Sequence, residues 1–235
     1  MGLDIALLAY KEEENLRVLL PRIRQALLGI DEPSRILVVD TATPLDGTER
    51  VCAENGALYF NQEEPGFGGA FRTAIARAES DKFLILDSDG SHDPAMIPAL
   101  YRRFVQGADV VIGSRYVEGG STHDAPVSVL LSRVLNGIFR RVIGLRTRDI
   151  STDFRIYRTE QLKRVTLEGR DFDVLQEVLL KLRLQKPDLV VVEVPVSFEK
   201  RLHGESKRDL PRFVRSYLKT LFRLLEIRRR ERRSR

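Results

Sequence analysis

Residues 83–94 read Phe-Leu-Ile-Leu-Asp-Ser-Asp-Gly-Ser-His-Asp-Pro, and this stretch decides the fold class. Its first part is an apolar run, Phe83–Leu86, which leads into two carboxylates spaced by one residue, Asp87 and Asp89. A short apolar run bounded by turn-forming residues is typical of a buried strand. Ligands of open α/β sheets bind beyond the carboxyl ends of the strands, so the acids are expected at a binding site. Paired carboxylates there can hold a divalent cation and, through it, a nucleotide diphosphate.

The Asp-x-Asp pattern is a weak signal when it is taken alone. Aspartate is frequent enough in this chain for roughly one such pair to arise by chance, and Asp171-Phe172-Asp173 is a second instance. The strand before the first pair and the turn residues after it favour the first pair as the site. A competing interpretation stays open, in which Asp87 and Asp89 only cap the helix that follows Pro94.

Alternating strand and helix patterns surround this stretch and predict an α/β fold. Such alternation is expected of βαβ units around a largely parallel sheet. The expected strands are Ile5–Ala9, Ile36–Val39, Leu58–Asn61, Phe83–Leu86 and Val110–Gly113. The expected helices between them are Leu16–Leu28, Glu49–Asn55, Gly69–Arg77 and Ala95–Gln106. The second half is less regular, with one late strand expected at Leu189–Val196.

Length and composition limit the class of protein. A chain of 235 residues, 43% hydrophobic and 31% charged, can form one large domain with a substantial core, which excludes disorder over most of its length. The single cysteine, Cys52, cannot form an internal disulfide and favours a reducing compartment. The sequence has neither a signal-peptide start nor an apolar segment long enough to span a membrane. We therefore expect a cytoplasmic protein that meets the inner membrane face peripherally.

Basic charge is concentrated near the C-terminus. Residues 200–235 carry 14 Lys and Arg against 4 Asp and Glu, whereas residues 1–199 are mildly acidic. Two segments, Val127–Leu145 and Leu210–Ile227, have an apolar face at helical spacing with Arg or Lys beside it. Such faces suit the headgroup region of an anionic membrane, although either segment could instead be a core helix. The run Arg228–Arg235 is expected to be frayed.

Further motifs follow in order along the chain. They are Ala9-Tyr10-Lys11-Glu12, Val38-Val39-Asp40, Asp46-Gly47-Thr48, Gly66-Phe67-Gly68-Gly69-Ala70, Asp87 to Pro94, Gly113-Ser114-Arg115-Tyr116, Ser132-Arg133, Asp149 with Phe154-Arg155, Glu193-Val194-Pro195, and Arg201 to Lys207. Together they resemble family 2 inverting glycosyltransferases of the GT-A fold, especially dolichyl- and polyprenyl-phosphate mannose synthases. The resemblance implies a Rossmann-like nucleotide-sugar-binding sheet with C-terminal amphipathic helices. Residues 1–208 would be the GT-A catalytic domain, and residues 209–235 a basic amphipathic helix and tail.

The resemblance also implies roles for individual residues. The donor-binding residues would be Ala9, Tyr10, Glu12, Asp40, Gly68, Asp87, Ser88, Arg201 and Lys207. A Mg²⁺ or Mn²⁺ ion would be held by Asp87, Asp89 and Ser91. The acceptor phosphate would be bound by Arg115, Ser132 and Arg133, because guanidinium groups grip phosphate bidentately. The catalytic residues would thus be Asp89, Arg115 and Arg133, although any of these arginines could instead be a surface ion-pair partner.

The implied reaction moves mannose from GDP-mannose onto a polyprenyl or dolichyl phosphate with inversion. A phosphate acceptor is mostly dianionic at neutral pH, since its second pKa is ~6, and needs positioning by cations rather than a general base. The sequence departs from the family at Lys11, at residues 41–45 and at Thr152-Asp153, where a small Ser-Gly pair is usual. A UDP-sugar donor, carrying glucose or N-acetylglucosamine, or a non-lipid acceptor is the alternative within the family.

Three other features of the sequence bear on other classes of protein and on possible partners. A nucleotidyltransferase would need a glycine-rich, basic start, which Leu7–Glu14 lacks. A module that binds RNA or a partner through Arg228–Arg235 would have no need of Asp87 and Asp89, so no nucleic acid is expected as a partner. A membrane partner subunit remains compatible with the sequence. His92, His123 and His203 are too scattered to predict a histidine cluster.

Overall fold

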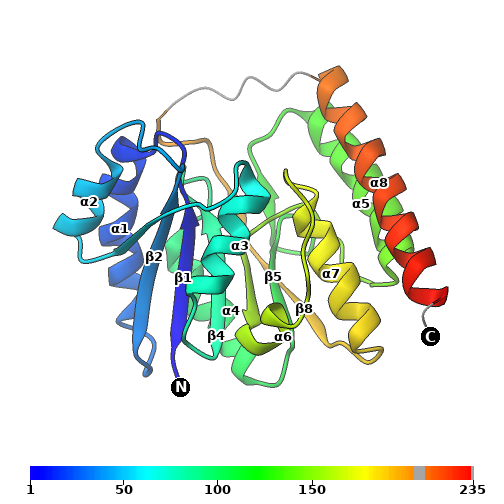
Figure 1. Ribbon diagram of the computed structural model, residues 1–235, viewed down its shortest axis with the longest axis horizontal. Coiled ribbons are helices and arrows are strands. Elements are labelled where there is room, and N and C mark those ends of the chain that lie inside the picture. Colours follow the sequence, from blue (N-terminus) through cyan, green and yellow to red (C-terminus); the bar gives the residue numbers. More distant parts are fainter. Residues whose placement is uncertain (204–209, 234–235) are drawn as a thin grey trace.

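In the computed structural model, β4 (Lys82–Asp87) lies at the centre of a seven-stranded sheet (Figure 1). The strand order is β3-β2-β1-β4-β7-β5-β8. The other strands of this sheet are β1 (Leu3–Leu8), β2 (Ser34–Asp40), β3 (Leu58–Asn61), β5 (Val110–Ser114), β7 (Arg155–Arg158) and β8 (Val191–Pro195). All neighbours are parallel except β7, which runs antiparallel to both β4 and β5. A separate two-stranded sheet pairs β6 (Ser121–Thr122) with β9 (Ser197–Phe198).

Helices cover both faces of the sheet, and each face has its own apolar core. One face packs against α1 (Glu13–Leu27), α2 (Thr48–Glu54) and, after the short 3₁₀ turn η1 (Pro94–Met96), α4 (Ile97–Val105). The other face packs against α3 (Phe67–Arg77), α5 (Pro126–Ile143), α6 (Thr159–Lys163), α7 (Val174–Gln185) and α8 (Leu210–Arg233). This arrangement confirms the α/β fold class expected from the alternating pattern.

The structure describes residues 1–203 and 210–233, and in α8 the side chains of residues 218–230. Lys207, which is predicted to bind the donor, therefore lies outside the described residues, as does the expected domain boundary between residues 208 and 209. Within the described residues, no helix has both the length and the apolarity needed to cross a membrane.

Helix α8 packs beside α5 and α7 on the β8 side of the sheet (Figure 1). Its Leu224 and Ile227 are buried, and Arg223 donates hydrogen bonds to the carboxylates of Asp173 and Glu177 around the start of α7. Residues 228–235 were expected to be frayed. This expectation is wrong for residues 228–233, because α8 continues to Arg233. A tertiary contact explains the extension, because Arg228 donates a hydrogen bond to the Val142 carbonyl oxygen on α5.

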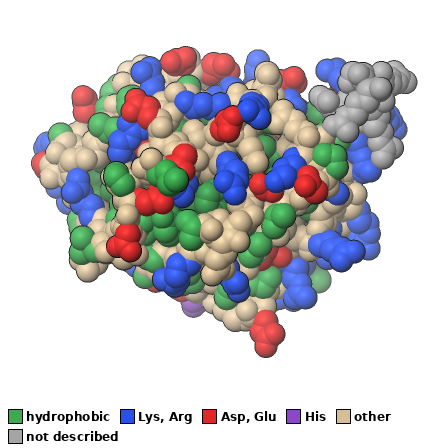
Figure 2. Space-filling view, turned by 90° about the horizontal axis from the view of Figure 1, so that it is seen from below, with side chains coloured by type: hydrophobic (Ala, Val, Ile, Leu, Met, Phe, Trp, Pro, Cys, Tyr) green, Lys and Arg blue, Asp and Glu red, His purple; other side chains and the backbone are tan. Residues whose placement is uncertain are grey.

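The end of the sheet opposite to the two acids is a mixed, charged surface. Figure 2 looks at this end, where acidic and basic side chains are interspersed and the basic ones predominate on the side of α5 and α8. The carboxyl ends of the parallel strands lie at the other end of the sheet, and the residues predicted from the motifs gather there.

Candidate active site

The acids of the opening motif are held at the end of β4 by hydrogen bonds. Asp87 is the last residue of the strand, and the Ser88 hydroxyl donates a hydrogen bond of 2.7 Å to the Leu8 carbonyl oxygen on the neighbouring strand. Asp89 Oδ1 accepts a hydrogen bond of 2.9 Å from the backbone N–H of Ser91. Gly90 between them has φ of 78°, a left-handed conformation that glycine adopts without strain. The local sequence therefore bends the chain so that both carboxylates remain near the strand end.

Asp87, Asp89 and Ser91 offer the oxygen donors that Mg²⁺ and Mn²⁺ prefer. The Ser91 hydroxyl lies 3.4 Å from Asp87 Oδ2. A cationic group already lies on Asp89, because Arg201 Nε is 2.9 Å from Asp89 Oδ2. The oxygen donor set fits the binding of a cation, which would share the Asp89 carboxylate with the Arg201 guanidinium.

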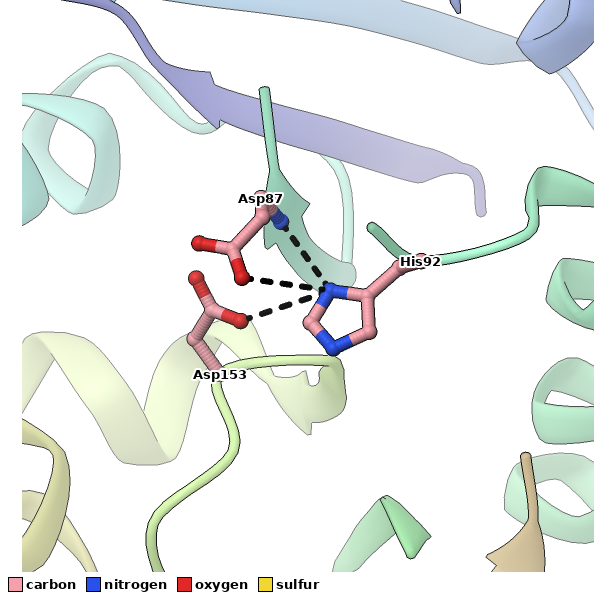
Figure 3. A group of neighbouring side chains, drawn as sticks. All are labelled: Asp87, His92 and Asp153. Carbon is pink, nitrogen blue, oxygen red and sulfur yellow. Dashed lines mark hydrogen bonds and ion pairs between the residues drawn. The ribbon is translucent and has the colours of Figure 1, made fainter. Parts of the chain in front are cut away.

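Two further side chains, His92 and Asp153, lie against Asp87 (Figure 3). His92 Nδ1 is 3.6 Å from Asp87 Oδ2 and 3.6 Å from Asp153 Oδ1. Burial lowers the pKa of His92, so the neutral imidazole is favoured. Burial and the facing carboxylate of Asp87 raise the pKa of Asp153 well above its ordinary value. Ligand atoms of the three residues lie within 4.8 Å of one another and could hold a metal ion.

The residues predicted to bind the nucleoside lie at the ends of β1 and β2. The Ala9 backbone N–H donates to the Val39 carbonyl oxygen, and the Tyr10 side chain is exposed. Asp40 is buried, and its carboxylate accepts a hydrogen bond of 3.0 Å from the Tyr59 hydroxyl. These positions leave the aromatic ring of Tyr10 free to contact a base, and their roles in binding remain predictions.

Glu12 lies near Asp87 and Asp89. Its carboxylate accepts a hydrogen bond from the Asn15 side chain. Burial, opposed by that hydrogen bond and reinforced by the charge of Asp89, raises the pKa of Glu12. Lys11 just before it has φ of 58°, a left-handed conformation that is uncommon outside glycine.

Gly68 has a structural reason to be glycine. Its N–H donates a hydrogen bond of 2.8 Å to the Arg170 carbonyl oxygen, and a Cβ on Gly68 would lie 1.9 Å from the Gly169 carbonyl oxygen. The structure thus places this turn against the loop before α7. The predicted contact of Gly68 with a donor remains a prediction.

A cavity of about 980 Å³ begins at the acids and passes between α5 and α7. Its polar lining includes Asp87, Asp89 and Arg115, and apolar side chains complete it. The apolar ones include Val127, Leu131, Phe172 and Leu175. Thr220 of α8 also lines the cavity, so the C-terminal helix forms part of its wall. A charged end joined to an apolar wall suits a ligand that has a phosphate and a hydrocarbon part.

Arg115 lies in this cavity and is firmly held by Asp149. Nε and Nη2 of the guanidinium form a bidentate pair with Asp149 at 2.7 and 2.9 Å, and Nη2 also donates to the Ser151 hydroxyl at 2.9 Å. Nη1 lies 3.9 Å from Asp124. The sequence predicts an arginine that grips phosphate, whereas the structure already uses two of its three nitrogens for a carboxylate. Nη1 is not used by Asp149, and a bound anion would share it with Asp124.

Ser132 and Arg133 are adjacent on α5 but face different surroundings. Ser132 lines the cavity, together with Arg115. Arg133 is exposed and is not among the lining residues; its guanidinium carbon lies 5.3 Å from the centroid of the Tyr116 ring. The structure therefore brings Ser132 to Arg115, and the catalytic and acceptor-binding roles of Arg133 remain predictions.

Sequence reasoning gave no role to three members of the site, His92, Asp149 and Asp153. His92 does not cluster with the other two histidines but joins Asp87 and Asp153, and Asp149 is the partner that fixes Arg115. A signal for Asp153 was present in the sequence, because Thr152-Asp153 stands where the resembled family has a small pair. The pairing of Asp149 with Arg115 spans 34 residues and leaves no local pattern.

Solved structures of similar fold support the architecture. Glucosyl-3-phosphoglycerate synthase from Mycobacterium tuberculosis, solved with Mn²⁺, UDP and glucosyl-3-phosphoglycerate, superposes with a TM-score of 0.75 at 20% identity. The likeness covers 96% of this chain and 80% of that one. A structure of the same enzyme with Mg²⁺ and UDP gives a TM-score of 0.74. The chain thus has the expected α/β fold of the GT-A glycosyltransferases.

Sequence comparisons narrow this class to a family. The family model "Glycosyl transferase family 2" matches residues 4–166. A dolichol-phosphate mannosyltransferase of Pyrococcus furiosus is 32% identical over 96% of this chain, which spans 64% of that protein. An undecaprenyl-phosphate mannosyltransferase of Micrococcus luteus is 34% identical, with 84% of each chain covered. A polyprenol monophosphomannose synthase of Mycolicibacterium smegmatis is 31% identical over 84% of this chain and 77% of that protein. The chain belongs to glycosyl transferase family 2 and is a glycosyltransferase.

Proposed function

We propose that this chain is an inverting, metal-dependent mannosyltransferase that uses GDP-mannose and a polyprenyl or dolichyl phosphate. The observation that carries the proposal is the cavity that joins Asp87 and Asp89 to an apolar wall on α5 and α7. A lipid phosphate needs both surroundings, one for its charge and one for its hydrocarbon chain. The three mannosyltransferase and mannose synthase relatives support the same acceptor class and sugar.

The residues of the site divide the work of the reaction. A Mg²⁺ or Mn²⁺ held by Asp87 and Asp89, beside the Ser91 hydroxyl, would neutralise charge on the leaving diphosphate. Nη1 of Arg115 and the hydroxyl of Ser132 hold the acceptor phosphate, whose oxygen attacks the anomeric carbon opposite to the leaving group. No general base is required, because the acceptor oxygen is already ionised. Apolar side chains of the cavity exclude water, which would otherwise hydrolyse the donor.

Arg201 and Lys207 complete the proposed donor site. Arg201 already lies on Asp89 and would bind the donor diphosphate from that position. Lys207 follows the resembled family in the same role and lies outside the described residues.

A panel of donors tests the proposal. We expect purified protein with Mn²⁺ and a polyprenyl phosphate in detergent to transfer sugar into the lipid phase from GDP-mannose and not from UDP-glucose or UDP-N-acetylglucosamine. Radiolabelled donors and butanol extraction would measure the transfer. Transfer from a UDP-sugar alone would contradict the assignment of GDP-mannose as the donor. It would favour a second candidate function, a glycosyltransferase that uses a UDP-sugar, which is suggested by the UDP bound in the similar solved structures.

We further propose that α5 and α8 place the protein on an anionic membrane, where its lipid acceptor resides. Apolar side chains are exposed on both helices, with Leu130 of α5 at 65% and Phe222 of α8 at 69% exposure. Arg133 and Lys219 are exposed on the same two helices. Basic residues beside an apolar face each add ~1 kcal/mol of attraction to an anionic leaflet.

Replacing both Leu130 and Phe222 by serine is expected to weaken binding to anionic vesicles about tenfold or more, because each buried side chain contributes ~1.5–3 kcal/mol. Co-sedimentation with phosphatidylglycerol vesicles would measure it. The matched control is Leu28→Ser, which removes a side chain with 77% exposure at the end of α1, on the other face of the sheet. Equal loss in the control would contradict a specific role of α5 and α8.

A further inference from the structure

The antiparallel strand β7 brings an unusual third carboxylate to the metal motif. β4 and β7 pair with Ile85 opposite Arg155, and continuing this register by two residues places Asp87 opposite Asp153. Like charges directly opposite each other on paired strands are destabilising. Two carboxylates this close must either share a proton or hold a cation between them.

Within the described residues no Lys or Arg forms an ion pair with Asp153, and the nearby charge of Arg155 offsets the burial of its carboxylate only in part. Asp153 is only 5% exposed, and within residues 1–203 and 218–230 no Lys or Arg nitrogen lies within ion-pair distance of its carboxylate. Arg155 is near in sequence, but its guanidinium donates to the carbonyl oxygens of Ile150 and Leu175 and to the Tyr157 hydroxyl. By contrast, Asp89 has Arg201 as its partner.

The third member of the group, His92, is also a metal-binding side chain. Its Nδ1 accepts the backbone N–H of Asp87 at 3.3 Å, and its Nε2 lies 3.3 Å from the Thr152 hydroxyl. Neutral imidazole nitrogen and carboxylate oxygen are both ligands of Mn²⁺ and related ions. Asp87, His92 and Asp153 all line the cavity, so an ion can reach the point where they converge (Figure 3).

We propose that Asp153 is an additional ligand of the divalent cation, so that the ion is held between β4 and β7 rather than by the Asp87–Ser91 motif alone. The proposal rests on the proposed function, since it concerns the cation of that reaction. With Asp153, two carboxylates and the His92 imidazole have ligand atoms within 4.8 Å of one another. The protein should therefore bind the cation without any nucleotide to complete its coordination.

The test is a Mn²⁺ titration of nucleotide-free protein, followed by the electron paramagnetic resonance signal of free Mn²⁺. We expect the wild type to bind Mn²⁺ and Asp153→Asn to bind it at least tenfold more weakly. The matched control is Asp171→Asn, which changes an exposed aspartate of the second Asp-x-Asp pair and should bind Mn²⁺ as the wild type does. No sugar donor or lipid is present, so failure of the mannosyltransferase assignment would leave this result unaffected.

Thermal unfolding in EDTA provides a second measurement. Asp153→Asn is expected to raise the unfolding temperature of the metal-free protein, because it removes one of two facing carboxylates, and to lose the increase that Mn²⁺ gives to the wild type. Should Asp153→Asn fail to fold, Asp153→Ser serves for both measurements. Equal Mn²⁺ affinity of variant and wild type, no Mn²⁺ binding by the wild type, or a lower unfolding temperature of the variant in EDTA would each overturn the proposal.

Discussion

Asp89→Asn is expected to reduce sugar transfer by a factor of about 10³ while leaving the protein folded. The substitution keeps the size of the side chain and removes the negative charge that faces Arg201. Electrostatic groups aimed at charge that develops in the transition state contribute ~10²–10³ each to turnover. Initial rates of transfer from GDP-mannose at saturating Mn²⁺ would measure the loss, and circular dichroism would confirm the fold.

Asp171→Asn is the matched control for this prediction. Asp171 belongs to an Asp-x-Asp pair of the same spacing, but it lies exposed in the loop before α7. Its substitution should leave transfer within twofold of the wild type. Full activity of Asp89→Asn, or an equal loss in both variants, would contradict the placement of the reaction at the end of β4.

Asp149→Asn is expected to destabilise the protein by ~3–5 kcal/mol at neutral pH, because it leaves the buried Arg115 without its counter-charge. Asp149 is fully buried, and its carboxylate accepts both guanidinium hydrogen bonds and the Arg115 backbone N–H. The free energy of unfolding in urea would measure the change. The exposed variant Asp171→Asn should change it by less than ~0.5 kcal/mol.

The difference in the free energy of unfolding between wild type and Asp149→Asn is expected to depend on pH in a definite direction. Burial alone would raise the pKa of Asp149, but the hydrogen bonds and charge of Arg115 outweigh burial and lower it. A lowered pKa stabilises the fold above the ordinary value of the unfolded chain, ~3.9, and this contribution falls by ~1.4 kcal/mol for each pH unit below that value. The difference between wild type and Asp149→Asn should therefore narrow below about pH 4. A difference that stays constant from pH 7 to pH 3 would contradict the ion-pair explanation.

The first half of the fold could be predicted from the local sequence pattern. Its strands are short apolar runs, and its helices have apolar residues at helical spacing. The strand expected at Leu58–Asn61 has those bounds in the structure, and the others differ by a few residues at their ends. Short apolar runs between amphipathic helices leave few alternatives to a parallel sheet. The position of Asp87 and Asp89 at a strand end could be predicted in the same way, since parallel strands have their carboxyl ends on one side of the sheet.

The strand β7 could not be found in the same way. It reads Arg-Ile-Tyr-Arg, which has no apolar run, and it is held in the centre of the sheet partly by the buried guanidinium of Arg155. Such hydrogen bonds to carbonyl oxygens of distant residues have no counterpart in the local sequence. The helix α7 was not predicted either, although Leu175, Val178, Leu179 and Leu182 have helical spacing and are all buried.

The sequence motifs predict candidate site residues, whose roles stay predictions, but they do not predict the side chains that hold those residues in place. The motifs placed Asp87, Asp89, Ser132 and Arg115 in one region, and the structure gathers them around one cavity. The partners of those residues come from segments far away along the chain, as Asp149 does for Arg115. Pairings of this kind depend on topology, which local periodicity does not specify.

The packing of α8 has a consequence for the order in which the protein acquires its shape during synthesis. The strands β1 to β4 are complete by residue 87, whereas β5 joins the sheet only through β7 and β8, and N-terminal segments fold first as a chain leaves the ribosome. The wall of the cavity, however, includes Thr220, and Arg223 joins that helix to Asp173 and Glu177. A nascent chain can therefore pair β1 to β4 well before α8 is available to close the wall of the cavity.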